Sequence, residues 1–278
     1  MKKSIGTFLI LFSCGLLIAC GGDKKEKTAA DVISAFKEFK RMMDKYDVCQ
    51  YKAVATSALR EARNGNRLVA EIMRTSQIRV QIIDGIEEAR LVQLAISRHF
   101  KARQISALIV DIGGGSVEVI VSYKGKIKGI ESLRLGTVRL LQDFNPDQDF
   151  DQMHSKIKQI IGRFFQKLSL PFDLHQLKLM VTGGNARCLG RLGMQFLGTS
   201  SPEFLTDSEV ASVLTLLHSL SHQARREELG LKTDRADVIL PAALIIYELM
   251  VFGGFKSLLI PPVGLKNGVL YDMKRVTN

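Results

Sequence analysis

Residues 106–122 read SALIVDIGGGSVEVIVS, and this stretch decides the fold class. Two largely apolar runs, 106–111 and 117–122, predict a pair of buried strands. The glycines between them, 113–115, let the backbone come close to a ligand with its N–H groups turned inward. The stretch therefore predicts a strand, turn and strand unit that can hold phosphate oxygens.

Two carboxylates flank this glycine turn. Asp111 ends the first strand, and Glu118 lies two residues after Ser116, so Glu118 and Ser116 point to the same face of the second strand. Carboxylate oxygens suit Mg²⁺, which they bind directly or through water. We therefore expect a phosphate and Mg²⁺ site, and the alternative is a glycine-rich hairpin with a solvated Asp111.

The sequence around this turn alternates between strand and helix patterns. The turn at 124–126 predicts a hairpin into a third strand, 127–133, so part of the sheet should be antiparallel. Further strands are predicted at 51–56, 79–83, 177–182 and 258–261, and helices at 31–45, 67–75, 87–100, 151–168, 235–251 and 264–272, with another helix after a capping box at 206–209. This alternation predicts an α/β architecture with two lobes.

Two polar motifs follow predicted strands. Arg60 lies just past the strand at 51–56, where ligands of α/β proteins usually bind, and a guanidinium can hold phosphate in a bidentate manner. Glu87 and Glu88 begin the helix at 87–100, where paired carboxylates can simply complement the helix dipole. The residues alone thus indicate a phosphate ligand at Arg60 and leave the two glutamates unassigned.

Composition favours a polyanionic partner. Lys and Arg outnumber Asp and Glu by 39 to 28, which gives a net charge of +11. The basic residues are scattered, and no zinc-finger spacing or RNA-stacking aromatic motif accompanies them, so a nucleic-acid partner is not expected. The four cysteines, Cys14, Cys20, Cys49 and Cys188, form neither a disulfide framework nor a metal-binding cluster.

The first thirty residues have the pattern of a targeting segment. A positive start at Lys2 and Lys3 precedes a largely apolar run at 5–19, which is short for a membrane span but suits a signal peptide. The run ends in Leu-Ile-Ala-Cys-Gly at 17–21, which resembles the bacterial lipoprotein box, so Cys20 is the predicted lipidation site. We expect a membrane-anchored lipoprotein that faces the periplasm or exterior. The alternatives are an apolar strand of the fold and, if the leader is not processed, a cytoplasmic protein.

Several motifs occur in the order found in one known family. They resemble those of exopolyphosphatases and guanosine pentaphosphate phosphohydrolases, the Ppx/GppA family, in its short form, and lie at 55–63, 85–90, 111–118, 183–184, 235–239 and 264–272. The resemblance implies an actin-like (ribonuclease H-like) two-lobe phosphatase fold. It also implies a homodimer that hydrolyses terminal phosphoanhydride bonds of inorganic polyphosphate or guanosine pentaphosphate with Mg²⁺ as cofactor.

The resemblance also implies residue roles. It makes Glu88 the catalytic base for the attacking water and Arg60 a ligand of the terminal phosphate, while Asp111 and Glu118 would bind Mg²⁺. The phosphate chain would be held by Gly113, Gly114, Gly115 and Ser116. Positioning and charge neutralisation are what phosphoryl transfer needs, and these residue types supply both. The glycine pair at 183–184 resembles the second-lobe turn of the actin-like superfamily, or is a plain strand-to-helix turn.

The chain departs from this family at its beginning. The usual first strand with an Asp-x-Gly-Ser/Thr-Asn-Ser phosphate loop has no counterpart, so we expect an incomplete first lobe. The predicted organisation is a signal peptide at 1–20, a polar tether at 21–30, a first lobe at 31–135 and a second lobe at 136–278. Beside a working phosphatase, two alternatives follow from the missing loop: a catalytically inactive, polyanion-binding lipoprotein, and a truncated family remnant.

Overall fold

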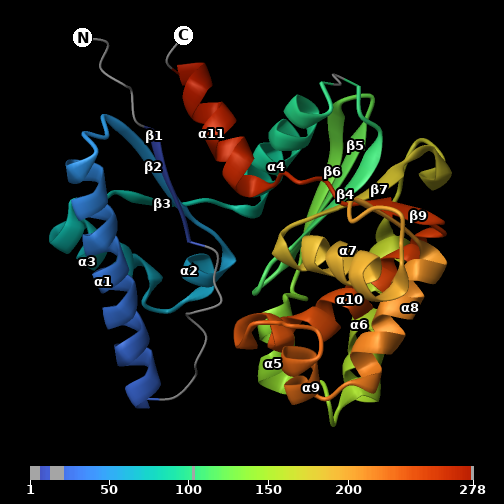
Figure 1. Cartoon of the computed structure of the whole chain (residues 1–278). Helices are drawn as coiled ribbons and strands as arrows, with labels where there is room; N and C mark the ends of the chain where they lie inside the picture. The colour runs from blue at the N-terminus through green and yellow to red at the C-terminus, as the bar shows by residue number, and fades with distance from the viewer. Residues whose placement is uncertain (1–6, 13–21, 102–103, 277–278) are drawn as a thin grey trace.

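A computed structural model shows two unequal lobes with helices between them (Figure 1). It describes residues 7–12, 22–101 and 104–276. Strands β1–β3 form one sheet, and β4–β9 form a second in the order β6-β5-β4-β7-β9-β8. The α/β architecture with two lobes is therefore present, as predicted.

The smaller lobe is built on a three-stranded parallel sheet. Its strands are β1 (Thr7–Phe12), β2 (Gln50–Ala55) and β3 (Val80–Ile82), and its helices are α1 (Gly22–Lys45), α2 (Ser57–Glu61) and α3 (Gly65–Ser76). The central strand β2 pairs with both neighbours. Val32 and Phe36 of α1 pack with Ile72 of α3 and Ala53 of β2 in one apolar core. This helical periodicity of apolar residues is what the sequence predicted for 31–45 and 67–75.

The described part of the apolar leader is a strand, while the signal-peptide interpretation stays a prediction. Part of it, Thr7–Phe12, forms β1, which pairs in parallel with β2. A continuous apolar run is also the pattern of a parallel strand, so the sequence fits both interpretations. Helix α1 begins at Gly22, so residues 22–30 of the predicted tether are helical here. Cys20 lies outside the described residues, and its lipidation stays a prediction.

The larger lobe contains a mixed sheet. Its strands are β4 (Ala107–Ile112), β5 (Val117–Tyr123), β6 (Lys126–Leu133), β7 (Lys178–Thr182), β8 (Phe204–Thr206) and β9 (Ser257–Leu259). The β4-β5-β6 meander is antiparallel, as predicted, whereas β7 runs parallel to both β4 and β9. The carboxyl ends of β4 and β7 therefore lie at the same edge, where each strand runs into a glycine turn.

The predicted lobe boundary at 135/136 does not match this sheet. The backbone pairing of β4 with β7 joins residues 107–133 to the same sheet as the later strands. The structure thus separates the two sheets between β3 and β4. The strand pattern in a sequence predicts where strands lie but not which strands pair, because pairing depends on contacts between distant residues.

Helices cover both faces of the larger sheet. The helices that follow β3 along the chain are α4 (Gly85–His99), α5 (Thr137–Asp143), α6 (Phe150–Lys167), α7 (Gly184–Leu197), α8 (Asp207–Ser219), α9 (His222–Glu227), α10 (Thr233–Gly253) and α11 (Leu265–Val276), with a 3₁₀ turn at Leu174–Gln176. Val92 and Ile96 of α4 pack on Ile109 of β4, whereas Val110 and Ile157 belong to the core on the opposite face. Alternate residues of one strand thus serve two cores.

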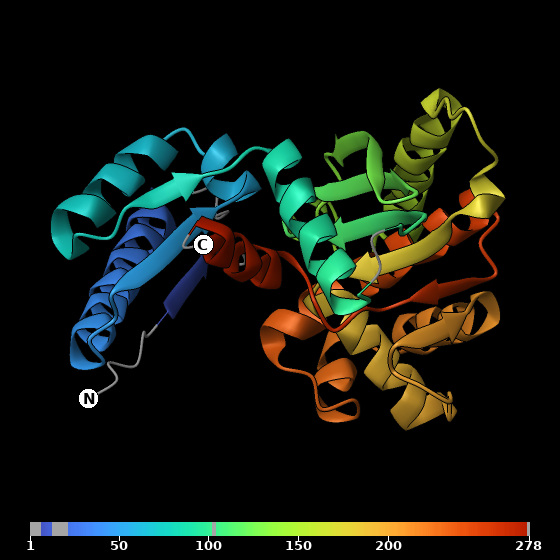
Figure 2. The same cartoon turned by 90° about the horizontal axis from the view of Figure 1, so that it is seen from above.

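The last helix returns to the smaller lobe. Helix α11 lies against α4 and β1, and Figures 1 and 2 show it between the two sheets. A Cβ atom on Gly268 would lie only 1.9 Å from the carbonyl oxygen of Leu91, so glycine permits the close crossing of α11 and α4. Asp272 then forms ion pairs with Lys52 of β2 at 3.0 Å and with Arg90 of α4 at 2.8 Å.

Helix α10 is the one helix among the described residues that is long and apolar enough to cross a membrane. Most of its apolar window, 72%, is buried inside the protein. Its side chains belong to the main core of the larger lobe, together with those of α6 and α8. Its composition is that of a core helix, as predicted for residues 235–251.

Candidate active site

Asp111 and Glu118 are directly opposite each other on the antiparallel strands β4 and β5. Glu118 is only 1% exposed, and its Oε1 accepts hydrogen bonds from Ser116 at 2.6 Å and from Ser132 of β6 at 3.0 Å. The prediction that Ser116 and Glu118 share a face is confirmed. Ser132 was not predicted, because its place in the site depends on the pairing of β5 with β6.

Glu88 joins these carboxylates from the first turn of α4. Asp84 caps that helix by accepting a hydrogen bond from the Glu87 amide at 2.8 Å, which fixes where the helix begins. Glu88 is 6% exposed, and its Oε2 is buried without a hydrogen bond. Arg60 of α2 brings Nη1 to 3.8 Å from that oxygen and donates a hydrogen bond to the Ile83 carbonyl at 2.8 Å. Arg60 and Glu88, separated in the sequence, thus meet.

Burial and neighbouring negative charges raise the pKa of both Glu88 and Asp111. Burial, followed by the charges of Glu118 and Asp111, raises the pKa of Glu88 to about 9, although Arg60 acts in the opposite direction. Burial and the charge of Glu118 raise the pKa of Asp111 to about 6, against the lowering effects of the Thr182 hydroxyl and Arg187. The site therefore gathers more negative charge than its own basic groups neutralise.

This donor set fits a hard divalent cation. Its ligands would be carboxylate oxygens, and the orphaned Oε2 of Glu88 shows that the site offers an acceptor which no protein donor satisfies. Within the described residues, no three His, Cys, Asp or Glu side chains are grouped so as to hold a metal ion by themselves. A cation held by Asp111 and Glu118 would take its remaining ligands from water or from phosphate oxygens, which is usual for Mg²⁺.

The glycine turn is held from the side of α5. A Cβ atom on Gly136 would lie 2.2 Å from the Gly114 carbonyl oxygen, so only glycine fits there. The amides of Thr137 and Arg139 donate to the carbonyls of Gly113 and Gly114 at 3.1 and 3.0 Å, and Arg139 Nε donates to Gly115 at 2.9 Å. The carbonyls of the turn are thus directed towards α5, which leaves its amide face for an anion.

Two predicted phosphate donors are already engaged. The amide of Gly113 donates to the carbonyl of Ser116 at 3.0 Å, and the Ser116 hydroxyl donates to Glu118. None of the hydrogen bonds within the described residues uses the amides of Gly114 and Gly115. These two amides are therefore the better placed of the predicted phosphate ligands, since they need no rearrangement.

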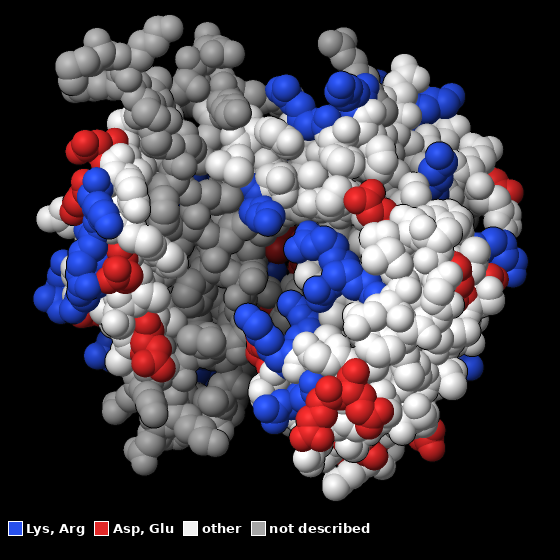
Figure 3. Space-filling model, viewed as in Figure 1, with Lys and Arg blue, Asp and Glu red and all other residues white. Residues whose placement is uncertain are grey.

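The second glycine turn lies beside the first. Gly183 adopts a φ of +102°, and a Cβ atom on it would lie 3.1 Å from Asp111 Oδ1. The Arg235 guanidinium lies over Gly184 and donates to Asn185 at the start of α7. Figure 3 shows Lys and Arg side chains along the wall that the larger lobe contributes to the hollow between the lobes. Both glycine turns thus lie next to the Asp111 carboxylate, with arginines around them.

Comparison with known proteins identifies the family of this chain. The Ppx/GppA phosphatase family matches residues 21–276. The chain belongs to this family. Exopolyphosphatase 1 of Mycobacterium leprae is 26% identical over 254 residues, which cover 89% of this chain and 75% of that protein.

Solved structures of the Ppx/GppA phosphatase family share the fold. The Ppx/GppA protein of Aquifex aeolicus has a TM-score of 0.73 and 23% identity, covering 91% of this chain and 83% of its own. An exopolyphosphatase from Cytophaga hutchinsonii has a TM-score of 0.78 and 23% identity, covering 94% and 85%. The predicted two-lobe phosphatase fold of this family is confirmed, and family membership supports a phosphoanhydride hydrolase that depends on a divalent metal. The residue roles stay predictions.

Proposed function

We propose that this phosphatase releases terminal phosphates from inorganic polyphosphate, with guanosine pentaphosphate as the second candidate substrate and Mg²⁺ as the metal. The observation that carries the proposal is the convergence of Glu88, Asp111 and Glu118 from three elements upon one glycine turn, beside Arg60. Phosphoryl transfer needs positioned charges more than covalent chemistry, and this site supplies acceptors for a cation, a cationic phosphate ligand and a base.

In this proposal Glu88 takes the proton of the attacking water. Its pKa of about 9 keeps it largely protonated at neutral pH in the free site, but makes it a strong base once ionised. Arg60 lies against the same carboxyl oxygen and would pair with the terminal phosphate. The amides of Gly114 and Gly115 would orient the next phosphate. Mg²⁺, held by Asp111 and Glu118, would neutralise phosphate charge.

The test is Mg²⁺-dependent phosphate release from long-chain polyphosphate by the full chain. Glu88→Gln should lower the rate by about 10²–10⁴-fold, which is the usual contribution of a general base. Glu87→Gln is the matched control, because Glu87 lies in the same helical turn but pairs with Arg90. Equal rates in wild type and Glu88→Gln would refute the role of Glu88. Competition between polyphosphate and guanosine pentaphosphate would rank the two substrates.

A polyanion-binding protein without turnover is the second candidate function. The engagement of the Gly113 amide and the Ser116 hydroxyl inside the turn weighs against turnover, because both groups were expected to hold the phosphate chain in place. The net charge of +11 would support such binding. Saturable polyphosphate binding by a folded protein that releases no phosphate would establish this candidate and exclude the phosphatase.

We further propose a lipid anchor at Cys20 and a homodimer, on the basis of the leader pattern and the family resemblance. An anchor would place the active site outside the cytoplasm. Metabolic labelling with a lipid precursor, compared between wild type and Cys20→Ala, tests the anchor directly. Membrane association without label would indicate that the apolar leader binds the bilayer unprocessed. Molar mass in solution tests the dimer.

A further inference from the structure

A separate cavity lies at the opposite end of β7 from the active site. It has a volume of about 350 Å³ and lies where the parallel strands β7 and β9 begin, at Lys178 and Ser257. The second glycine turn follows Thr182, at the other end of the same strand. At a rise of about 3.3 Å per residue, the strand separates the two places by more than 10 Å. The cavity is therefore distinct from the phosphate site.

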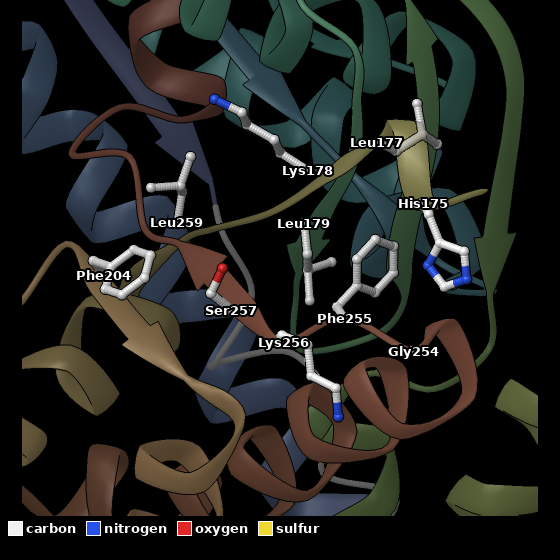
Figure 4. Close-up of a pocket in the computed structure, with 10 residues that line it drawn as sticks. All are labelled: His175, Leu177, Lys178, Leu179, Phe204, Gly254, Phe255, Lys256, Ser257 and Leu259. Carbon is white, nitrogen blue, oxygen red and sulfur yellow. The ribbon is translucent and has the colours of Figure 1, made fainter. Parts of the chain in front are cut away.

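The cavity walls are largely apolar and include aromatic rings. Leu179 of β7, Leu259 of β9, Phe255 and Phe204 contribute to the lining (Figure 4). Phe204 remains 38% exposed. The volume is near the lower end of the range of about 300–1,000 Å³ found for small-molecule sites. The walls thus suit one ring or a short branched chain rather than a protein segment.

The end of α10 shapes one side of this cavity. Gly254 adopts a φ of +65° as the C-cap of α10, and a Cβ atom there would lie 3.3 Å from His175 Cε1. Glycine thus lets the helix end approach the imidazole and turn the chain into Phe255. In Figure 4 the ring of Phe255 lies between Leu179 and His175. The cavity therefore combines a backbone turn, an aromatic ring and an imidazole.

The rim of the cavity carries an excess of positive charge. Lys178 forms no ion pair within the part of the chain that the structure describes. Lys256 pairs with Asp207 at 3.2 Å, yet its side chain is 87% exposed. Figure 4 shows the two ammonium groups on opposite sides of the apolar lining. An apolar ligand with a single negative charge matches both the walls and the rim.

We propose that this cavity binds a small amphiphilic anion, namely an aromatic carboxylate whose ring packs against Phe204 and Leu259 and whose charge faces Lys178, which lies on the same face of the sheet. The ring would replace water on the apolar walls, and its face would stack on or abut the phenylalanine. The carboxylate would neutralise the ammonium that lacks a partner. The proposal does not depend on phosphatase activity, because none of the active-site groups lines the cavity.

The experiment uses the full chain and 2-naphthoate, followed by ligand-observed NMR titration. We expect saturable binding, and weaker binding of the uncharged analogue 2-naphthalenemethanol. Lys178→Glu should weaken naphthoate binding by about tenfold or more, which corresponds to about 1.4 kcal/mol. Lys128→Glu makes the same change of charge on the exposed face of β6 and should leave binding unchanged.

Two further measurements separate the cavity from other anion sites. Ser257→Phe should fill the cavity and abolish binding while both lysines remain, with the thermal melt showing that the variant folds. Long-chain polyphosphate should not displace the naphthoate, since it would occupy the active site. The proposal is overturned by displacement with polyphosphate, by equal binding to wild type and Lys178→Glu, or by no saturable binding at millimolar concentrations.

Discussion

Glu88 is the residue at which burial, like charge and an incomplete ion pair act together. Its carboxyl group is buried, faces the charges of Glu118 and Asp111, and reaches Arg60 only at 3.8 Å. A group in this position destabilises the fold whenever it ionises, because nothing in the protein fully compensates the charge. Such costs are typical of functional sites, where the geometry suits a ligand rather than the free protein.

This cost gives a pH-dependent stability prediction. Between its usual pKa of 4.5 and the folded value of about 9, Glu88 binds a proton more tightly in the folded state, so stability falls as the pH rises through this range. The Glu88→Gln variant should therefore have a larger free energy of unfolding than wild type at pH 9, by about 1–3 kcal/mol, and a higher melting temperature. The two proteins should differ little in stability at pH 4. The measurement is thermal unfolding with a chelator present. A difference that does not grow with pH would contradict the prediction.

At this scale the sequence predicted contacts that are local and missed those that are distant. Ser116 and Glu118 were placed together correctly because strand periodicity fixes which residues share a face. The meeting of Arg60 with Glu88 came from the family resemblance, since no local pattern joins α2 to α4. Ser132 and Gly136 carry no signal of their own in the sequence. Their roles arise from the β5–β6 pairing and from the contact of α5 with the glycine turn.

At the scale of secondary-structure elements, the contact between α5 and the glycine turn shapes the site most directly. Gly136 lets the start of α5 approach so closely that the carbonyls of the turn are bound there. Any side chain at this position must move either the helix or the turn. The orientation of the amide face therefore depends on a residue that is not itself predicted to bind substrate.

Gly136→Ala should consequently damage both stability and activity. A Cβ atom 2.2 Å from the Gly114 carbonyl oxygen requires backbone movement, which typically costs about 1–3 kcal/mol. Gly129→Ala on β6 is the matched control, because its Cβ atom would meet nothing within 4 Å. Chemical denaturation and phosphate release of both variants provide the measurement. If the two variants behave alike, the close approach is not a constraint in solution.

Helix prediction succeeded where apolar periodicity is long and failed where elements are short. Helices α3, α4, α6 and α10 match the predicted ranges closely, and the capping box at Thr206 is present at the start of α8. Helices α5 and α9 and strand β8 were not predicted. Segments of three to seven residues show too few repeats for a period to stand out, and their structure depends on tertiary contacts.

Across the whole molecule, Asp272 links three distant segments. It receives charge-assisted hydrogen bonds from Lys52 and Arg90, and it holds α11 against the smaller lobe. Burial raises the pKa of Asp272, but the bonds from Arg90 and Lys52 outweigh it, so the pKa lies below the usual value. The carboxylate therefore stabilises the fold above its unfolded pKa of 3.8, and this contribution is lost as the pH falls.

Asp272→Asn should lower the melting temperature at pH 7. The two bonds to charged groups would be weakened while Lys52 and Arg90 keep their charges in a partly buried place, with an expected cost of about 1–3 kcal/mol. Asp234→Asn is the control, because Asp234 is exposed at the start of α10. Thermal unfolding of both variants decides the matter. A loss of stability that is equal in the two would show that the network contributes nothing specific.

The leader makes a second prediction at this scale, because its two interpretations exclude each other. Cleavage before Cys20 would remove β1 from the sheet and leave β2 with one paired edge. If β1 belongs to the mature fold, a protein of residues 21–278 should melt several degrees below the full chain. Equal melting temperatures would indicate that β1 contributes nothing to stability, as expected for a cleaved leader.

The return of α11 to the smaller lobe has a consequence for biosynthesis. The helix that packs beside β1 and α4 leaves the ribosome after β9, whereas β1 and α4 emerge before any strand of the larger sheet. The larger lobe can form its sheet once β9 has emerged. The smaller lobe cannot complete its packing until residues 265–276 have emerged as well. Until then its apolar surface stays exposed to chaperones and proteases. A stop codon before residue 265 would therefore damage the smaller lobe, most of which is synthesised before the larger one.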